Sequence, residues 1–493
     1  MNTDIGFDKC TNLCIFTTLI QLSMVARKEQ IAMIDETLTI KKSSFVAFTG
    51  RRRVGKTFLI DQKYSSKMCL SVTGIQGISS RKQISNFINK LEEYSKQPIL
   101  SKPTNWQDAF VLLKSYLQKL PKNRKQVIFI DELPWMCNAK NGLLQLLAHL
   151  WNDYLSKEKH FILVICGSAT AWITQKIIND KGGLHNRITH SIHLKPFTLA
   201  ETKEFFIERK MTLTNNAIAE IYMTMGGIPF YLENIKRGES PTKAVERMCF
   251  SDNGLLKNEY QNLYKALFNY PENHEAIVSA LAFSNSGISR EELIKKSKVQ
   301  AGGPFTRAMT DLLLSGFVVE DAPTGKLKKG SLYRLVDEFS VFHHRFIKKN
   351  KKAGKDVWQT IATSQAYKIW KGFAFETLCK KHIQEIKNAL GIKNVYTKTN
   401  SFSYKHEKDS FQIDLLIDRN DSTINLCECK FYDAPFEIDK KYAMQLLTRR
   451  SLFKIATKTR KNVFNTMITN HPMKQNAYSL DCVDNHLTIN ELF

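Results

Sequence analysis

Three short apolar runs in the first half of the chain are typical of buried strands. They occupy residues 45–48, 127–130 and 161–166, and each is followed by glycine or polar residues. Apolar runs without alternation are expected where helices cover both faces of a parallel sheet. Helical periodicity precedes the first run at residues 25–38 and lies between the runs at residues 82–120 and 141–155. The first half is therefore predicted to be an α/β domain with a parallel sheet.

The second half of the chain has a different order of elements. Its predicted helices lie at residues 275–283, 288–294, 303–313, 370–379 and 449–461. Its predicted strands lie at residues 316–320, 332–335, 411–418 and 424–430. A basic turn at residues 325–330 joins the first two strands, and the last helix is rich in lysine and arginine, which could grip a nucleic-acid backbone. This order predicts a small module of helices and a hairpin, and then a second α/β domain.

The first apolar run leads into a glycine-rich segment of the P-loop type. Its glycines are followed by lysine and threonine and then by the start of a helix. In such a loop, backbone N–H groups and the helix N-terminus bind phosphate, the lysine reaches the outer phosphates and the threonine hydroxyl holds Mg2+. The alternative is a plain glycine-rich turn, but the flanking strand and helix favour an ATP-binding loop. The predicted nucleotide-binding residues here are Gly50, Arg51, Arg52, Arg53, Val54, Gly55, Lys56 and Thr57.

Acidic, hydroxyl and arginine side chains follow the next two strands. Asp131 and Glu132 end the second run as in a Walker B strand, where Asp131 would hold the water shell of Mg2+ and Glu132 would act as general base. Ser168 follows the third run and either senses the terminal phosphate or caps the next helix. Arg187 lies on a later loop, where it either neutralises charge on a transferring phosphoryl group or is a solvated or ion-paired side chain.

Net charge is the unusual bulk property of this chain. The 493 residues are too many for one core and suggest about three domains. They include 72 basic and 47 acidic residues, which gives a net charge of +25. That excess favours a polyanionic partner, nucleic acid before an anionic membrane. A solvated basic surface without a partner is the alternative.

Cysteine spacing and hydropathy indicate a compartment. The ten cysteines show no paired zinc-type spacing, so we expect reduced thiols and a cytoplasmic protein. No apolar run is long enough to span a bilayer, and the start of the chain lacks the pattern of a signal peptide. Residues 1–23 are either a flexible extension or precede a true start at Met24.

Strand alternation brings charged residues together in the second α/β domain. Glu428 and Lys430 point to one face of their strand, while the cysteines beside them point to the other. Pairing with the strand at 411–418 would place Asp414 next to them, and Glu376 interrupts the apolar face of the preceding helix. Two carboxylates can bind Mg2+, and a lysine beside the metal can position or deprotonate water for phosphodiester hydrolysis. The alternative is an exposed strand, because Glu-x-Lys is common in such strands.

Together these motifs resemble the archaeal-type AAA+/STAND-related P-loop ATPases. The resemblance is carried by the loop at residues 50–57, the Walker B strand end, Ser168, Arg187 and a Gly-Gly-Ile-Pro segment at residues 226–229, and it covers about residues 24–470. It implies an ATPase core with a helical lid, a winged helix and a C-terminal α/β domain similar to PD-(D/E)XK nucleases, which have the restriction-endonuclease-like fold. It also implies that Gly227 and Pro229 in the lid approach the nucleotide.

The resemblance also bears on the C-terminal carboxylates and on the domain boundaries. Asp414, Glu428 and Lys430 match the Asp-x(n)-Glu-x-Lys pattern of those nucleases, and Glu376 matches the helical carboxylate that many of them add. The predicted domains are an N-terminal extension (1–23), an AAA+-type ATPase core (24–200), a helical lid (201–270), a winged helix (271–346), a basic linker (347–365) and a PD-(D/E)XK nuclease-like domain (366–493).

The expected function is an ATP-binding and ATP-hydrolysing machine coupled to a DNA-binding, nuclease-like domain. ATP and Mg2+ are the expected cofactors, and DNA is the expected partner. The winged helix either contacts DNA or recruits proteins, and an Arg187 that acts in a neighbouring subunit would require an oligomer. The alternative is a nucleotide-dependent signalling switch that recruits partner proteins and carries an inactive nuclease-like domain.

Overall fold

The computed structural model describes residues 25–138, 140–179, 182–184, 186–268, 270–321, 331–351, 357–406 and 409–493. These residues form two compact units. The first contains the described residues up to Pro196 together with Ile228–Phe230 and Thr310–Ser315. The second contains Phe197–Gly227, Tyr231–Met309 and Gly316–Phe493.

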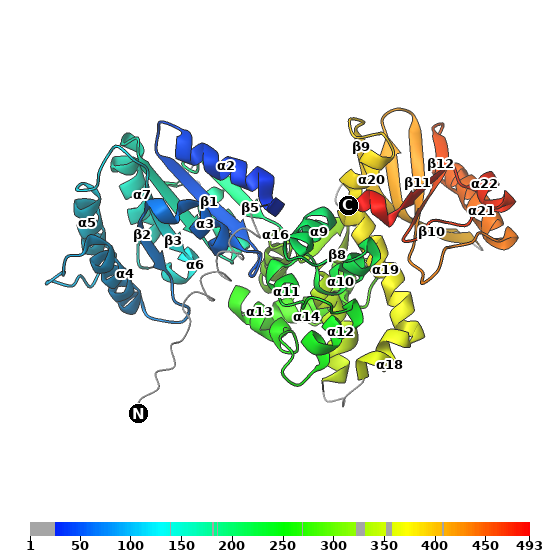
Figure 1. Ribbon diagram of the computed structural model, residues 1–493, viewed down its shortest axis with the longest axis horizontal. Helices are drawn as coiled ribbons and strands as arrows, with labels where there is room; N and C mark the ends of the chain where they lie inside the picture. Colours follow the sequence, from blue (N-terminus) through cyan, green and yellow to red (C-terminus); the bar gives the residue numbers. More distant parts are fainter. Residues whose placement is uncertain are drawn as a thin grey trace, which may run out of the picture. The chain divides into compact units, whose positions relative to one another are not determined.

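A five-stranded parallel sheet forms the centre of the first unit (Figure 1). Its strand order is β2-β3-β4-β1-β5. The strands are β1 (Ser44–Gly50), β2 (Met68–Thr73), β3 (Gln126–Asp131), β4 (Phe161–Cys166) and β5 (His190–Leu194). All residues of β1, β3 and β4 are buried, as the three apolar runs predict. The predicted α/β fold with a parallel sheet is confirmed.

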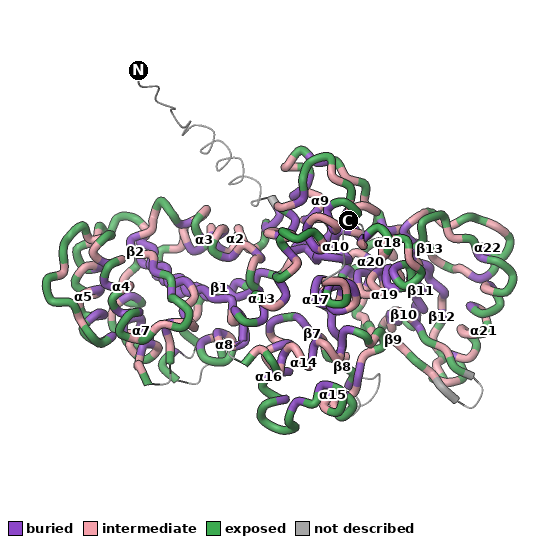
Figure 2. Tube along the Cα trace, turned by 90° about the horizontal axis from the view of Figure 1, so that it is seen from below, coloured by how far each residue is buried: buried purple, intermediate pink, exposed green. Residues whose placement is uncertain are grey.

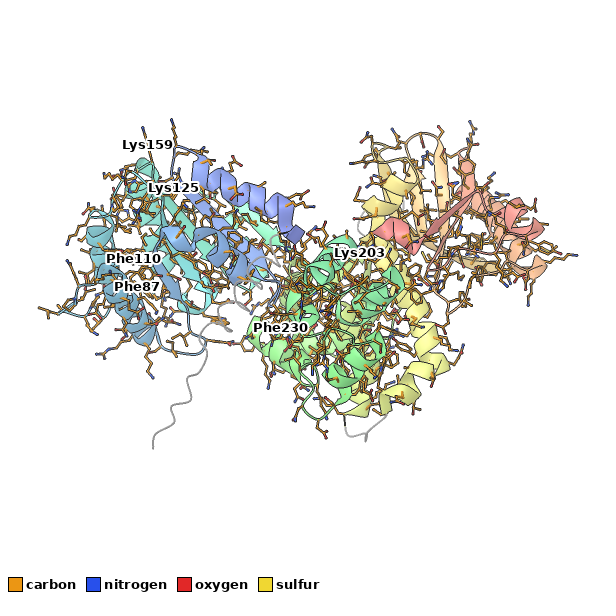
Figure 3. The ribbon with its side chains drawn as sticks, viewed as in Figure 1. Phe87, Phe110, Lys125, Lys159, Lys203 and Phe230 are labelled. Atoms are coloured by element: carbon orange, nitrogen blue, oxygen red, sulfur yellow. The ribbon has the colours of Figure 1, made fainter. Side chains whose placement is uncertain are left out.

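The helices of the first unit pack around this sheet. They are α2 (Lys28–Thr39), α3 (Lys56–Tyr64), α4 (Ser80–Ser95), α5 (Trp106–Leu117), α6 (Leu133–Met136), α7 (Leu143–Asp153) and α8 (Thr170–Ile173). The helical pattern at residues 82–120 forms two helices, because Lys96 ends α4 in a left-handed conformation and two prolines follow. Phe87 of α4 and Phe110 of α5 lie side by side, with ring centroids 6.0 Å apart, and join the two helices in one core (Figure 3).

The second unit begins with helices and a small sheet. The helices are α9 (Leu199–Glu208), α10 (Asn215–Met225), α12 (Pro241–Val245), α13 (Glu259–Leu267), α14 (Pro271–Leu281), α15 (Arg290–Ser297), α16 (Gly303–Leu314) and α17 (Glu338–Phe342). The α11 helix (Pro229–Glu233) begins in the segment that belongs to the first unit, and α16 ends in a segment of that unit, Thr310–Ser315. The sheet has the antiparallel order β6-β8-β7. Its strands are β6 (Ile288–Ser289), β7 (Val318–Asp321) and β8 (Leu332–Leu335).

Two predicted basic segments adjoin this region. The turn at residues 325–330 lies outside the described residues. The segment assigned as a basic linker contains α18 (Val357–Thr363). Trp358 of this helix is buried and stacks on Phe250, with ring centroids 5.0 Å apart. This part of the linker is therefore anchored by an aromatic contact.

A second five-stranded sheet forms the C-terminal part of the second unit. Its order is β13-β12-β11-β10-β9, antiparallel from β9 to β11 and parallel from β11 to β13. The strands are β9 (Thr397–His406), β10 (Asp409–Arg419), β11 (Thr423–Lys430), β12 (Asn462–Thr469) and β13 (Asn485–Thr488). The helices are α19 (Gln365–Lys381), α20 (Ile383–Ala389), α21 (Lys440–Thr457) and α22 (Ala477–Cys482). Figure 2 shows buried residues along β1 of the first sheet and β11 of this one.

The side-chain alternation predicted for β11 is confirmed. Cys429 lies against Cys379 of α19, while Glu428 faces α21 on the other side of the strand. The eight cysteines among the described residues are free thiols, and seven of them are buried. In the described part of the chain, no helix combines the length and the apolar character needed to cross a bilayer.

Candidate functional site

The P-loop connects β1 to α3 in the first unit. Gly50 has a φ of 140°, and a Cβ atom there would lie 2.4 Å from the Leu194 carbonyl oxygen of β5. Only glycine fits at this position, because it has no Cβ atom and adopts a positive φ easily. Gly50 therefore allows the strand to turn sharply into the loop. Val54 is buried in the loop, and its carbonyl oxygen accepts a hydrogen bond from Arg27 at 3.3 Å. The residue after it, Gly55, immediately precedes α3.

The lysine and threonine of the P-loop lie where a phosphate and its metal ion would be held. Lys56 is buried, and its ammonium group donates hydrogen bonds to the carbonyl oxygens of Gly50 at 2.7 Å and Arg51 at 2.9 Å. Thr57 Oγ1 donates to Asp131 Oδ2 at 2.9 Å. A hydroxyl and a carboxylate in contact form the oxygen donor set that Mg2+ prefers. These residues therefore fit a bound Mg2+–nucleotide.

The three arginines of the loop occupy different surroundings. Arg51 is buried, and Arg52 is exposed. Arg53 has a φ of 71°, and its guanidinium lies 3.9 Å from the ring centroid of Phe230. Phe230 follows Pro229 in the short segment that belongs to the same compact unit as the P-loop. This cation–π contact connects the loop to the Gly-Gly-Ile-Pro segment.

Glu132 is held by Ser168 across the sheet. Glu132 Oε2 accepts hydrogen bonds from the Ser168 backbone N–H at 3.0 Å and from Ser168 Oγ at 3.1 Å. Burial raises the pKa of Glu132, while these two hydrogen bonds and the Lys56 charge oppose that rise. Ser168 does not cap the next helix, because the residue before α8 is Ala169. The helix-cap alternative is therefore wrong, and the hydroxyl acts on the carboxylate.

Arg187 and Gly227 each make a backbone contact within their own unit. Arg187 is exposed on its loop, and its backbone N–H donates to the Leu184 carbonyl. Gly227 O accepts from the backbone N–H of Phe197 at 2.7 Å, and a Cβ atom on Gly227 would lie 2.1 Å from Phe197 O. Gly227 is thus required for this close backbone approach, and Pro229 is the first residue of α11. The nucleotide roles of these residues stay predictions.

Asp414 and Glu428 face each other on two neighbouring strands, in the middle of β10 and near the end of β11. The β10–β11 register pairs Leu415 with Cys427, so Asp414 and Glu428 are the next facing positions. Asp414 lies in a β-bulge between β10 and β9, and its Oδ2 accepts from the Cys429 backbone N–H at 3.0 Å. Bulges of this kind often redirect a side chain near a functional site. The expected proximity of Asp414, Glu428 and Lys430 is present.

The negative charge of Glu428 is stabilised by Lys430 and by two residues that the sequence analysis did not include, Tyr442 and Arg449. Its Oε1 accepts from Lys430 at 2.7 Å and from the Tyr442 hydroxyl at 2.7 Å, and its Oε2 accepts from Arg449. Tyr442 and Arg449 are two helical turns apart on α21, so an i, i+7 pattern could have revealed them. The sequence had suggested that the basic helix grips a nucleic-acid backbone, but Arg449 instead pairs with the site carboxylate.

The carboxylates of this site differ in charge state. Burial, followed by the Asp414 charge, raises the pKa of Glu376 to about 8. Burial, followed by the Glu428 charge, raises the pKa of Asp414 to about 6. Burial would raise the pKa of Glu428, but Lys430 and Arg449 hold it below its ordinary value. Lys380 and Lys430 offset the rise at Glu376 and Asp414 only in part, and a bound cation would stabilise the ionised carboxylates further.

Lys380 is a further charged residue that the sequence reasoning missed. It follows Glu376 by one turn of α19, a spacing that could have found it. Burial lowers the pKa of Lys380, the Arg334 charge lowers it further, and Glu376 and Asp414 oppose the shift. Among the described residues, no group of three or more His, Cys, Asp and Glu side chains is close enough to hold a metal ion. The three carboxylates thus do not form a ready three-ligand site.

Comparison with known proteins identifies the first part of the chain. Residues 24–235 match a family described as an ATPase domain predominantly from Archaea. This segment is an archaeal-type ATPase domain. Its P-loop, the Thr57–Asp131 contact and Glu132 lie within the matched residues.

Similarity extends beyond the ATPase domain. The chain is 26% identical over 438 residues to the uncharacterized protein MJECL04 of Methanocaldococcus jannaschii, covering 87% of this chain and 92% of that protein. The Walker-type ATPase paby2304 of Pyrococcus abyssi is similar in structure, with a TM-score of 0.48, 19% identity and coverage of 65% of this chain and 95% of that one. The Aeropyrum pernix ORC2 protein gives a TM-score of 0.41 with 14% identity, over 67% of this chain and 95% of that one.

Proposed function

We propose that the ATPase domain hydrolyses ATP with Glu132 as the general base and with Mg2+ held by Thr57 and Asp131. The observation that carries this proposal is the arrangement at the β3 end, where Asp131 accepts from Thr57 and Glu132 accepts from Ser168. Bound Mg2+ would neutralise charge on the phosphates. Lys56 would exchange its bonds to loop carbonyls for bonds to phosphate oxygens, as a P-loop lysine does.

Ser168 and Glu132 act as one unit in this proposal. Two hydrogen bonds from Ser168 stabilise the ionised carboxylate, while burial makes it a stronger base than an exposed glutamate. Glu132 takes the proton from the attacking water. Arg187, Gly227 and Pro229 are proposed to approach the phosphates when nucleotide is bound, and the Arg53–Phe230 contact supports that role for the neighbouring Gly-Gly-Ile-Pro segment.

Nucleotide binding and phosphate release, measured separately, test the ATPase proposal. Lys56→Ala is expected to lose binding, whereas Glu132→Gln should bind ATP and release little phosphate. The matched control is Glu93→Gln, which changes an exposed glutamate on α4. Normal turnover by Glu132→Gln would overturn the assignment of the base.

A second activity is favoured by the C-terminal carboxylates. We propose that this region is a PD-(D/E)XK nuclease-like domain that cleaves DNA under the control of the ATPase. The facing positions of Asp414 and Glu428, the β-bulge at Asp414 and the raised pKa of the neighbouring Glu376 support it. The elements α19, α20, β9, β10, β11, α21 and β12 follow one another as in an α/β domain. Mg2+ would be held by Asp414 with Glu376 and Glu428 nearby, and Lys430 would position the attacked phosphate or the water.

The small module before it supports a DNA partner. The elements α14, β6, α15, α16, β7 and β8 follow one another as in a winged helix. In such a module α16 would enter the major groove and the hairpin would contact phosphates. The net charge of +25 is consistent with a polyanionic partner.

Cleavage of supercoiled and linear DNA tests the nuclease proposal, with Mg2+ or Mn2+ and with or without ATP. Asp414→Asn and Lys430→Ala should abolish cleavage and leave ATP hydrolysis unchanged. Asp418→Asn is the control, since Asp418 lies on the same strand but pairs with Lys461 at 2.6 Å. Absence of cleavage by the wild type, with ATPase activity intact, would favour the signalling switch that recruits partner proteins.

A further inference from the structure

A groove opens beside the C-terminal carboxylates. It lies between α19, which packs against β11, and the residues that follow β11. Its volume is about 390 Å³. Glu376 and Lys430 line it together with Lys368, Lys371, Ile369 and Tyr432. Asp433 also lines it and pairs with Lys371, which is buried. The groove therefore joins the proposed reaction site to an exposed surface of Lys368, Ile369, Tyr432 and Asp433.

Tyr432 is an exposed aromatic residue that is held rigidly in this groove. Its side chain is 48% exposed. The ring stacks on Phe436 at a centroid distance of 5.3 Å and an interplanar angle of 13°. Asn470, which is buried, fixes the backbone on both sides by accepting from Tyr432 N at 2.9 Å and donating to Tyr432 O at 2.8 Å. A ring so supported loses little conformational freedom when another planar group stacks on it.

The same aromatic cluster leads to the carboxylates. Phe436 makes an edge contact with Tyr442, at a centroid distance of 5.3 Å, and Tyr442 donates to Glu428. A planar group on Tyr432 would therefore lie a short distance along the groove from Lys430. The stacking position and the proposed reaction site belong to one continuous surface.

Charge and apolar surface alternate along the groove. Lys368 is exposed on α19, and Lys371 pairs with Asp433 at 2.7 Å and with Glu220 at 3.6 Å. The next residue to Lys368, Ile369, is 52% exposed. Ammonium groups suit phosphates, and exposed aromatic and aliphatic side chains suit the faces of bases. A duplex keeps its base faces inside the stack, so it would offer Tyr432 only sugar and phosphate.

We propose that this groove binds a single strand of DNA, with one unpaired base stacked on Tyr432 and the adjoining phosphate directed toward Lys430. The inference rests on the proposed nuclease-like function and names its substrate as unpaired DNA. Lys368 contacts the backbone on the side away from the carboxylates, and Ile369 packs on the neighbouring base or sugar. Frayed ends, flaps and single-stranded gaps present such a strand.

Direct binding measurements test the groove without requiring cleavage. Fluorescence anisotropy with the full-length protein in EDTA compares a thymidine oligonucleotide, a uridine oligonucleotide and a duplex of equal length. Tyr432→Ala should weaken binding of the single DNA strand by roughly tenfold, as expected for loss of one base–aromatic stack. Tyr432→Phe should retain it within about twofold because the ring remains. Duplex binding should change little in either variant.

Tyr478→Ala is the matched control, because Tyr478 is 43% exposed on α22 and does not line the groove. Equal losses in the Tyr432 and Tyr478 variants would overturn the proposal, as would duplex binding that is as sensitive to Tyr432→Ala as single-strand binding. Tighter binding of the uridine strand would overturn the assignment of DNA and indicate that the groove binds RNA. Metal-dependent cleavage of single-stranded DNA by Tyr432→Ala at the wild-type rate would refute the role of the groove and leave the nuclease proposal standing. ATP hydrolysis by each variant checks that it folds.

Discussion

The contact between Ser168 and Glu132 makes a quantitative prediction for Ser168→Ala. The substitution removes the hydroxyl donor at 3.1 Å and keeps the backbone N–H donor at 3.0 Å. A hydrogen bond to a charged group contributes about 1.5–3 kcal/mol, and one pKa unit corresponds to about 1.4 kcal/mol. Loss of this donor disfavours the ionised carboxylate, so the pKa of Glu132, already raised by burial, should rise further by about one unit.

The rate of ATP hydrolysis as a function of pH measures this effect. The base works only when ionised, so activity rises as pH rises through the pKa of Glu132. In Ser168→Ala the acidic limb should move to higher pH by about one unit, with a fall of about tenfold below the limb and little change on the plateau. Ser168→Thr keeps a hydroxyl and should lie near the wild type. An unshifted limb with a lower plateau would refute this reasoning, and it would instead indicate that Ser168 contacts the phosphate.

Two further predictions concern stability. The pKa of Glu376 is about 8 in the folded protein against 4.5 ordinarily, so its contribution to the free energy of unfolding is fully present below pH 4.5 and is lost as pH rises through 8. The free energy of unfolding in urea should therefore decline by a few kcal/mol at most over this range, and Glu376→Gln should remove the decline while saturating Mg2+ reduces it. The same pH dependence in the wild type and in Glu376→Gln would contradict this prediction. Gly227→Ala should lower the melting temperature, since its Cβ would lie 2.1 Å from Phe197 O and such overpacking costs about 1–3 kcal/mol or more. Gly303→Ala, where a Cβ meets nothing within 4 Å, is the control, and equal melting temperatures would count against the steric argument.

The central strands were predictable because burial on both faces leaves a continuous apolar signature. The edge strands β2 and β5 were not predicted, since each mixes buried and exposed positions over a short length. The P-loop and Asp131 could be placed because strand, loop and helix are adjacent in sequence. The Ser168–Glu132 contact depends on two side chains that approach across neighbouring parallel strands. Local sequence patterns therefore offered only a phosphate sensor or a helix cap for Ser168, and they missed the contact with Glu132.

In the C-terminal sheet, the partners of Glu428 likewise could not be predicted from local sequence patterns. Strand alternation predicts which face Glu428 occupies, because that depends only on the pleat of β11. Tyr442 and Arg449 come from α21, after the chain has left the strand and returned. Their approach depends on how that helix packs on the sheet. A basic helix therefore suggested nucleic-acid binding, although part of its charge is used within the fold.

Because of these internal ion pairs and hydrogen bonds, the three carboxylates have different roles. Glu428 is held ionised by Lys430 and Arg449 whether or not a cation is bound, so it acts as a fixed charge. Glu376 and Asp414 have raised pKa values and give up protons when a divalent cation approaches. Cation binding at the proposed site should therefore release protons and strengthen with rising pH. This pH dependence of cation binding comes from Glu376 and Asp414. Glu428, held by its contacts with α21, keeps Lys430 in place beside the groove.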